Sequence, residues 1–181
     1  MPRWQYHAGG NTMAMVASNN TPPPAPKLAV MAEVRQENAF LKLGDIKGKA
    51  TTDKFKDQIV FQSMSYGVNQ AGEWEEGDRL SGNITTFADL VIVKEMDAAS
   101  PSLAKACAVK EQIPKAEITL ISGKDVMCKV TLDDVIVSNV SVGFHSAEAR
   151  PTETIALRYR AAMWEWGTSK AGYDLRKGVK K

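Results

Sequence analysis

Hydrophobic and polar residues alternate along most of the chain from residue 39 onward, and a period of two is typical of β-strands. The pattern predicts several extended segments, separated by stretches that are rich in glycine and polar residues. The acidic pair Asp133-Asp134 interrupts one strand, and the apolar positions change parity after Ala161-Ala162, so both places are predicted to be bulges or bends. The predicted strands are a short one that begins at Ala39, then Ile59–Val68, Ile84–Lys94, Lys115–Leu120, Met127–Val142 and Thr152–Trp166.

One convincing helical pattern lies between two of these strands, in the sequence SPSLAKACAVKEQIP. Ser100 is expected to cap the helix N-terminus, and Pro101 is expected at the first helical position, where a missing N–H costs nothing. Pro114 is expected to end the segment. Apolar residues at positions i, i+3 and i+4 predict the stripe that packs on the strands, formed by Leu103, Ala106 and Cys107.

A polar segment, Asn69–Asn83, separates the second and third strands and is predicted to be a long loop, because it contains three glycines and a run of charges. Such a run is most often a solvated surface. However, it also includes Trp74 and Arg79, and these residue types anchor many protein–protein contacts. The segment is therefore either a solvated loop or a contact site.

The segment Leu41–Thr51 partly matches a phosphate-binding loop. In that motif four residues separate two glycines, and a lysine is followed directly by serine or threonine at the start of a helix. Here three residues separate Gly44 from Gly48, Ala50 stands at the hydroxyl position, and a strand follows. The segment is therefore predicted to be a polar connection between two strands.

Composition divides the chain into three parts. Residues 1–35 include three consecutive prolines and many small polar residues, so this N-terminal extension is predicted to be disordered. Residues 36–167 hold all the predicted strands and the helix. Residues 168–181 carry five lysines or arginines and one aspartate, and they are expected to form an interaction arm or a solvated end. The net charge of +2 does not suggest a nucleic-acid-binding domain, which would show a basic face with interleaved aromatics.

Few residues could carry catalytic or metal chemistry. Cys107 and Cys128 are too few for a disulfide framework or a zinc site, and they favour a reducing compartment during folding. The two histidines, His7 and His145, belong to no catalytic or metal-binding motif. Asp133-Asp134 could bind a cation, although carboxylates in a strand bend are more often a solvated edge. We also find no apolar run long enough to span a membrane and no signal-peptide layout.

Several segments, in order and with matching spacing, resemble the haemolysin-coregulated protein (Hcp) family. AFLKLGDIKGKATTDKFKDQIVFQSMSYGV resembles the opening strands of the family. FADLVIVKEMDAASPSLAKACAVKEQIPKAEITL resembles its middle section, with the pattern strand, K-x-x-D-x-A-S-P-x-L, short helix, I-P-x-A, strand. VTLDDVIVSNVSVG and PTETIALRYRAAMWEW resemble its closing strands. The resemblance spans about Glu37–Trp166, and the N-terminal extension and the basic tail depart from it.

The resemblance implies a mainly β fold, an antiparallel barrel or sandwich with one short helix that assembles into six-membered rings. Rings of this family stack into the inner tube of type VI secretion systems, which a contracting sheath propels. The implied partners are further copies of the chain, sheath, spike and baseplate proteins, and effectors in the ring lumen, with no cofactor and no enzymatic activity. The implied location is the cytoplasm during assembly and then the outside of the cell.

The resemblance also suggests where the contacts lie. The family has a long extension used in ring stacking at the position of Gly72–Gly82, so the residues expected to make ring-to-ring contact are Glu73, Trp74, Glu76 and Arg79. Two alternatives remain. The chain could be the tail-tube protein of a phage-like or extracellular contractile particle, with the same fold. A small β-barrel hydrolase is disfavoured, because no nucleophile–base arrangement is visible.

Overall fold

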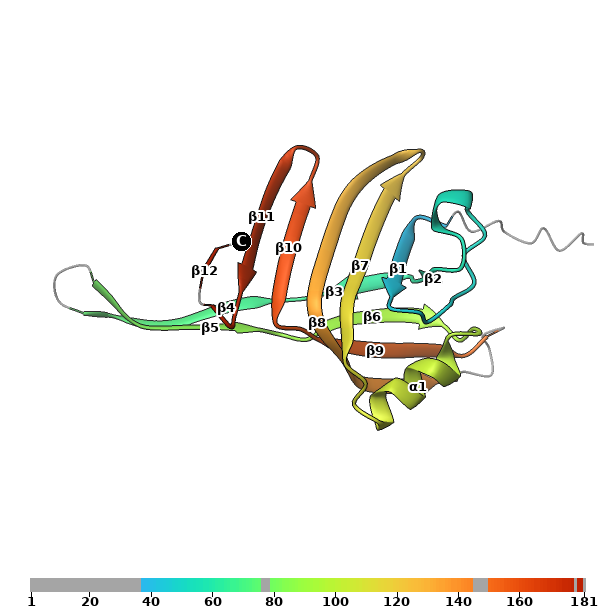
Figure 1. The fold of residues 1–181 in the computed structure, drawn as a ribbon, viewed down its shortest axis with the longest axis horizontal. Coiled ribbons are helices and arrows are strands. Elements are labelled where there is room, and N and C mark those ends of the chain that lie inside the picture. Colours follow the sequence, from blue (N-terminus) through green and yellow to red (C-terminus); the bar gives the residue numbers. More distant parts are fainter. Residues whose placement is uncertain (1–36, 76–78, 145–149, 178, 181) are drawn as a thin grey trace, which may run out of the picture. The chain divides into compact units, whose positions relative to one another are not determined.

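The computed structural model describes residues 37–75, 79–144, 150–177 and 179–180, with the backbone alone at 72–75, 79–84 and 179–180. This part of the chain is mainly antiparallel β-structure with one α-helix, α1, and one short 3-10 helix, η1 (Figure 1). The helical elements are α1 Ser100–Ala108 and η1 Asp53–Phe55. The strands are β1 Ala39–Leu43, β2 Ile59–Val60, β3 Ser63–Ser65, β4 Val68–Glu75, β5 Arg79–Phe87, β6 Leu90–Glu95, β7 Ile113–Ser122, β8 Asp125–Gly143, β9 Thr152–Arg158, β10 Ala161–Trp166, β11 Ser169–Asp174 and β12 Val179–Lys180.

The strands close into a barrel, because two segments of chain each take part in two groups of strands. Residues 59–65 pair first with β1, through β2, and then with β6, through β3. The long strand β8 pairs with β7 in its first part and with β9 in its second part. Since β1 pairs with β7 and β6 pairs with β9, hydrogen bonds run around the whole circuit. The predicted barrel is therefore observed.

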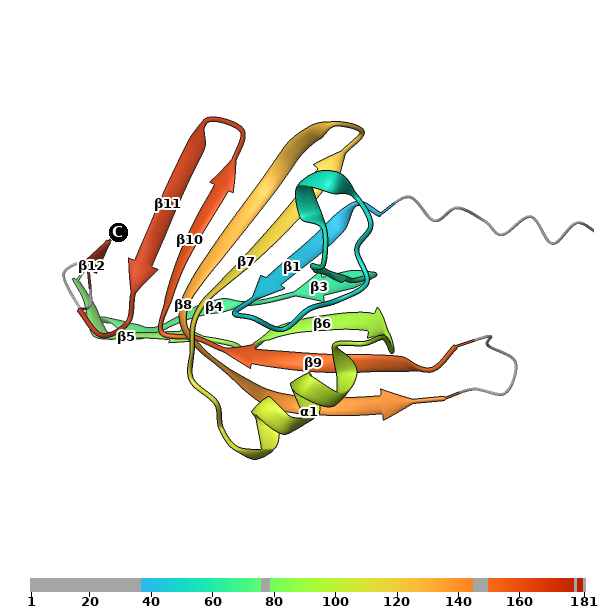
Figure 2. The ribbon, with the colours of Figure 1, turned by 45° about the vertical axis from the view of Figure 1, so that its right-hand side comes forward.

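The strand β8 bends where it passes between its two sets of partners. Up to Asp133 it pairs with β10, and from Ile136 it pairs with β9. Between them Asp134 has a φ of 53°, in the left-handed region that aspartate tolerates better than most residues. The bend predicted from Asp133-Asp134 is confirmed. On the outer side of β8, the strands β10, β11 and β12 continue the sheet beyond the barrel (Figure 2).

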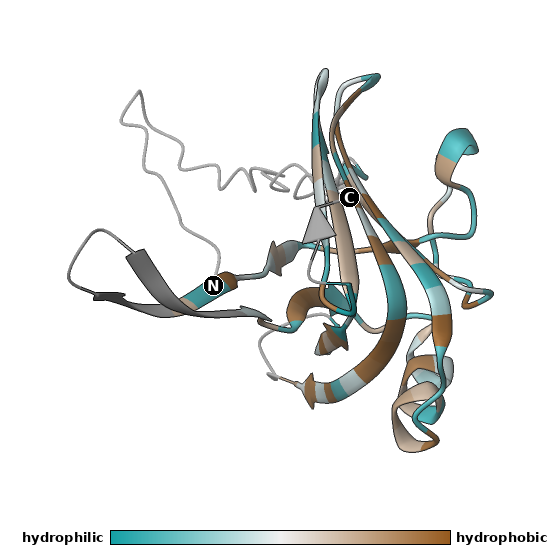
Figure 3. Cartoon of the chain, turned by 60° about the vertical axis from the view of Figure 1, so that its left-hand side comes forward, coloured by the Kyte–Doolittle hydropathy of each residue, from teal (hydrophilic) through white to brown (hydrophobic). Residues whose placement is uncertain are grey.

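Alternating apolar side chains fill the barrel interior, and Figure 3 shows the matching hydrophobic and hydrophilic bands along the strands. The helix α1 packs against β8 and closes part of the barrel. Of the predicted packing stripe, Leu103 and Ala106 are fully buried, and Cys107 is partly buried against the same core. The largest fully buried apolar side chains are Phe40, Leu41, Leu43, Ile59, Leu90, Ile92, Leu103, Ile118, Leu132, Ile155 and Leu157.

Three predicted strands are interrupted in the structure. Ile59–Val68 is divided into β2, β3 and the start of β4, because residues 61–62 lie where the chain changes partners from β1 to β6. Ile84–Lys94 is broken at Ala88-Asp89, and Thr152–Trp166 at Tyr159-Arg160. At the last break the chain leaves the pairing of β9 with β6 and joins β10 to the first part of β8. Periodicity along one strand carries no information about such changes of partner.

The structure also differs from the sequence-based expectations for the segment Asn69–Asn83, the basic tail and the two ends of the helix. Asn69–Asn83 is not a long loop, because most of it lies in β4 and β5, which pair with each other as a hairpin. Residues 169–174, within the basic tail, form β11 and pair with β10. The helix begins one residue earlier than expected: Ser100 is its first residue, Ala99 stands at the cap position, and neither side chain caps the helix N-terminus. The helix also ends at Ala108, well before Pro114, which lies in β7.

Candidate functional site

The hairpin of β4 and β5 is the most distinctive surface feature of the described chain. In the described chain its two strands pair only with each other, and Figure 1 shows them extending away from the other strands. The backbone pairs Glu73 with Ser81, Trp74 with Leu80 and Glu75 with Arg79. Three of the four predicted contact residues, Glu73, Trp74 and Arg79, therefore lie near the far end of the hairpin, where only their backbone is described. Glu76 lies outside the described residues.

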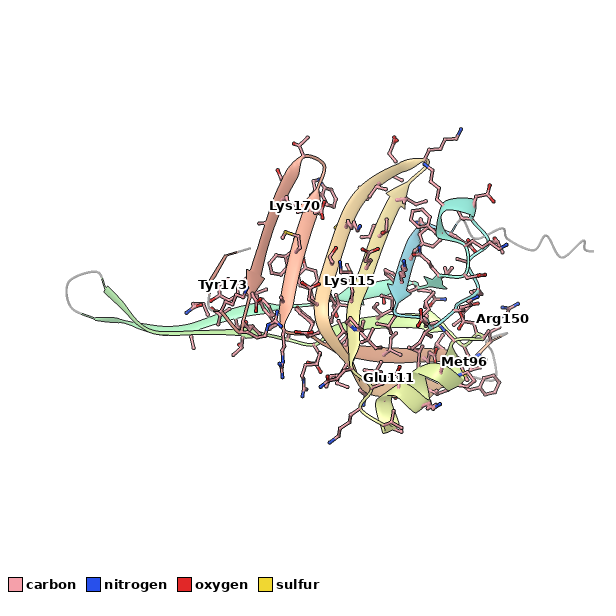
Figure 4. All side chains as sticks on the ribbon, in the orientation of Figure 1. Met96, Glu111, Lys115, Arg150, Lys170 and Tyr173 are labelled. Carbon is pink, nitrogen blue, oxygen red and sulfur yellow. The ribbon has the colours of Figure 1, made fainter. Side chains whose placement is uncertain are left out.

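Aromatic side chains surround the root of the hairpin, where β5 ends. The ring of Phe87 lies 5.2 Å from the ring of Tyr159, 6.0 Å from that of Trp164 and 6.1 Å from that of Tyr173, measured between centroids. Tyr66, just before β4, stacks on Trp164 at 6.3 Å. Figure 4 labels Tyr173 at the end of β11 that lies beside the hairpin. We call these five residues the aromatic root. Aromatic pairs at such distances contribute about 0.5–1.5 kcal/mol each beyond the area they bury.

An ion pair holds the chain two residues after Phe87. Asp89 accepts two hydrogen bonds from Arg158, from Nε at 3.0 Å and from Nη2 at 3.1 Å. It also accepts one from the hydroxyl of Ser138 at 2.6 Å. These hydrogen bonds, with that of Arg158 the largest cause, lower the pKa of Asp89 although partial burial opposes the shift. Ser138 lies where the register of β8 against β9 shifts, so a bulge points its side chain at Asp89.

Two polar atoms in the aromatic root have no hydrogen-bond partner within the described chain. They are the hydroxyl of Tyr159 and Nε1 of Trp164. Tyr159 is 4% exposed, and burial, together with the nearby Tyr66 and Asp89, raises its pKa to about 12. Buried hydroxyl and indole groups usually find an acceptor. The aromatic root is therefore a partly buried aromatic cluster with two polar atoms that have no hydrogen-bond partner in the described chain.

A second polar cluster anchors α1 to the barrel. The ammonium group of Lys94, fully buried in β6, donates to Asp97 Oδ1 at 2.8 Å and to Glu153 Oε1 at 2.7 Å. The hydroxyl of Ser100 donates to the same Glu153 oxygen at 2.7 Å and accepts the backbone N–H of Asp97. Asp97 Oδ2 and Glu153 Oε2 are buried and have no hydrogen-bond partner among the residues that the structure describes. This helix anchor explains why Ser100 does not cap the helix: its hydroxyl is used elsewhere.

A third cluster closes the C-terminal corner of the fold. Arg176 forms ion pairs with Asp174 at the end of β11 and with Asp134 at the bend of β8. The hydrogen bond from Arg176 is the main cause that lowers the pKa of Asp174 to about 2. The acid that the sequence offered as a cation ligand, Asp134, therefore binds a guanidinium group of the chain itself. Arg176, in the basic tail, therefore forms ion pairs within the folded domain.

The remaining candidates show no reactive arrangement. Gly48 is required by packing, because a Cβ there would lie 2.5 Å from the backbone of Gln58 and Ile59, and its N–H donates to the carbonyl of Asp57. The predicted strand connection is confirmed. Cys107 and Cys128 are free thiols, and burial raises the pKa of Cys128.

No group of three or more His, Cys, Asp or Glu side chains in the described ranges is placed to hold a metal. Nor does that part of the chain contain a helix with the length and hydropathy needed to cross a bilayer. Both histidines lie outside it.

A groove of about 520 Å³ lies between the connection after β1 and the helix α1. Asp45 and Glu111 line it together with Lys47 and Lys105. Because both signs of charge are present, the groove does not select an anion in the way that a phosphate site would.

Sequence reasoning missed Asp89, Arg158 and Ser138, which are 20 to 69 residues apart. Ser138 lies in β8, Arg158 in β9, and Asp89 in the break between β5 and β6. For Lys94 a signal existed, because strand alternation places it on the same face as Leu90 and Ile92. A lysine on a core face requires a buried partner. That partner, Glu153, could not be identified without the pairing of β6 with β9.

Comparisons with known proteins agree over most of the chain. Residues 40–166 match the family model described as type VI secretion system effector, Hcp. The chain is similar to Protein hcp1 of Pseudomonas aeruginosa, with 29% identity over 136 residues, 73% of this chain and 84% of that protein. Its fold is similar to the crystal structure of Hcp1 from Salmonella typhimurium, with a TM-score of 0.70, 31% identity and coverage of 80% and 98% of the two chains. A structure described as a type six secretion system protein gives a TM-score of 0.74 at 26% identity, covering 80% of this chain and 99% of the other.

Proposed function

This chain belongs to the Hcp family of type VI secretion systems, whose members are secreted tube proteins, and we propose that it works as six-membered rings that stack into the inner tube. A closed barrel with a sheet extension supports this proposal. The strands β10 and β11 continue the sheet past the barrel, so further copies can add around a ring. A ring forms from a repeated contact that closes, and a tube forms when a second contact repeats along the ring axis.

The hairpin of β4 and β5 is the proposed contact between rings. It supports this role because its strands have no partner beyond each other in the described chain. A two-stranded ribbon is marginally stable alone, so docking against another ring would complete it. The contacts at its far end are assigned to Glu73, Trp74, Glu76 and Arg79. Tryptophan and arginine are the residues that most often dominate interface energy.

Two further parts of the proposal concern partners. The exposed side of α1, opposite Leu103 and Ala106, is available to the sheath, while spike and baseplate proteins would engage the tube ends. Effector proteins would travel inside the ring lumen. The tube would assemble in the cytoplasm and leave the cell through the secretion system itself, without a signal peptide. These roles are structural, so they require no cofactor and no catalysis.

Negative-stain electron microscopy of the purified protein tests the architecture. We expect six-fold rings and stacked tubes, and size-exclusion chromatography with light scattering should give six times the chain mass. A version that begins at residue 36 shows whether the N-terminal extension affects stacking. The variants Trp74→Ala and Arg79→Glu should retain rings but shorten tubes. If tube length is unchanged in both variants, the hairpin is not the stacking contact.

A second candidate function uses the same fold. A tail-tube protein of a phage-like or extracellular contractile particle would also form stacked rings. The two functions differ in the machine that surrounds the tube, so the neighbouring genes and secretion of the protein by living cells distinguish them. Release that depends on the type VI sheath would exclude the particle.

A further inference from the structure

We propose that Asp89 is a positioning residue: its pairing with Arg158 and Ser138 sets the direction in which the hairpin of β4 and β5 leaves the barrel. The inference rests on the proposed function, because it takes the hairpin to be the contact between rings. It adds a requirement at the root of the hairpin, at the opposite end from the predicted contact residues. Stacking should then depend on a side chain that touches no neighbouring ring.

The backbone at the root needs such a support because the pairing of strands is interrupted there. The strand β5 ends at Phe87 and β6 begins at Leu90, so Ala88 and Asp89 belong to neither. One backbone hydrogen bond, from the N–H of Ala88 to the carbonyl of Gly67, closes the base of the hairpin at 2.9 Å. No sheet hydrogen bond in the described chain joins β4 or β5 to the barrel. The angle between the hairpin and the barrel therefore depends on side-chain contacts.

Two sets of side chains supply that support from different strands. Phe87 is surrounded by Tyr159, Trp164 and Tyr173 of the aromatic root, which restrain it by stacking and edge contacts. Aromatic contacts tolerate sliding, since several offset geometries have similar energies. The pairing of Asp89 is directional in comparison. A guanidinium group that donates from two nitrogens to both oxygens of a carboxylate fixes their relative orientation, and the hydroxyl of Ser138 adds a third fixed direction.

The exposure of the Asp89–Arg158 ion pair indicates that it positions the hairpin and does not mainly stabilise the whole fold. The side chain of Arg158 is 65% exposed, and that of Asp89 is 24% exposed. An ion pair this accessible to water contributes little to the free energy of unfolding. The pair nevertheless has a defined geometry, with three hydrogen bonds of 2.6, 3.0 and 3.1 Å that meet on one carboxylate. Its main effect is therefore expected on the orientation of the hairpin and not on the stability of the barrel.

The test compares Asp89→Asn, Arg158→Gln and the double variant with the unmodified full-length chain. A matched control is Glu117→Gln, which removes a partly exposed ion pair to Lys129 at 3.6 Å between the barrel strands β7 and β8. Ring mass is measured by light scattering, melting temperature by circular dichroism, and the number of rings per tube by electron microscopy. Each single variant should retain rings and melting temperature but weaken the ring-to-ring association constant about tenfold. Because the mean length of a linear stack grows as the square root of that constant, the mean number of stacked rings should fall about threefold.

The double variant distinguishes positioning from unrelated damage. Because Asp89 and Arg158 act through one another, losing both should be no worse for stacking than losing either. Additive losses, or tubes of normal length in Asp89→Asn, would overturn the inference. It would also be overturned if both single variants lost rings or melted well below the control, since the pair would then stabilise the barrel itself. Absence of tubes from the unmodified protein would instead contradict the proposed function.

Discussion

Replacing Lys94 by methionine is expected to destabilise the fold far more than replacing Glu153 by glutamine. In their charged forms the three ionisable groups of the helix anchor, Lys94, Asp97 and Glu153, comprise one cation and two anions, all buried. Removing the lysine leaves two carboxylates in the interior with no cation. Removing the charge of Glu153 leaves one lysine opposite one aspartate, and the amide oxygen of glutamine can still accept from Lys94 and Ser100.

Breaking a buried ion pair by removing one partner costs about 3–5 kcal/mol. Lys94→Met should lie at the upper end, about 5 kcal/mol, because two carboxylates lose their partner at once. Glu153→Gln replaces a charged acceptor by a neutral one while the ammonium group of Lys94 keeps Asp97 as its partner, and the loss is about 1–2 kcal/mol. In a domain of this size 1 kcal/mol corresponds to about 2–4 °C in melting temperature. The expected decreases are thus about 10–20 °C for Lys94→Met and about 2–8 °C for Glu153→Gln.

Urea unfolding followed by circular dichroism measures both variants. All samples must have one protein concentration, since assembly stabilises the folded state by mass action. The variant Glu117→Gln serves as the control, because its ion pair with Lys129, at 3.6 Å, is partly exposed and should be worth at most about 1 kcal/mol. Equal losses for Lys94→Met and Glu153→Gln, or a larger loss for the second, would refute the reasoning from net charge.

Three shorter predictions concern other positions. Because Arg176 lowers the pKa of Asp174 from 3.8 to about 2, this pair stabilises the fold above pH 4 and its contribution is lost as the pH falls through 2. A plot of melting temperature against pH should therefore be flatter for Asp174→Asn than for the unmodified chain between pH 4 and 2. Gly48→Ala, whose Cβ would lie 2.5 Å from backbone atoms, should cost about 1–3 kcal/mol in urea unfolding. Gly123→Ala, in open space at a φ of 62°, should cost about 1 kcal/mol, and equal costs would contradict the packing argument. Burial raises the pKa of Tyr159 from 10.0 to about 12, so the unmodified chain should lose stability between pH 10 and 12. Tyr159→Phe should lose less in alkaline melting experiments, and an identical loss would show that this hydroxyl is not responsible.

Local periodicity predicted the strands that face a single core. Apolar residues at every second position, Leu90 and Ile92 in β6 and Ala116 and Ile118 in β7, correctly mark the buried faces of these strands. It failed where the chain changes partners, as at Ala88-Asp89, because the apolar pattern continues across the break. The hairpin was mistaken for a loop for a related reason. Its strands have no barrel face to bury, so their glycines and charges give no alternating signal.

The candidate site was less predictable than the fold, because its contacts join distant parts of the chain. Ser100 has the sequence position of a helix cap, yet its hydroxyl donates to Glu153, 53 residues away. Asp89 and Arg158 are 69 residues apart and meet only once β6, β8 and β9 are assembled. The resemblance to a family identified the region of the hairpin. It could not identify the residues at the root, for which we propose a positioning role.

The strand β8 has a mechanical consequence for a protein that is pushed through a cell envelope. It runs without interruption from Asp125 to Gly143 and pairs with strands on both sides of its bend at Asp134. A force that separates the two groups of strands must therefore break the pairing of β8 with one of them, and the continuous backbone still joins the two groups. We expect a load that enters at β10 to reach β9 through β8, so that the two groups of strands resist shear together.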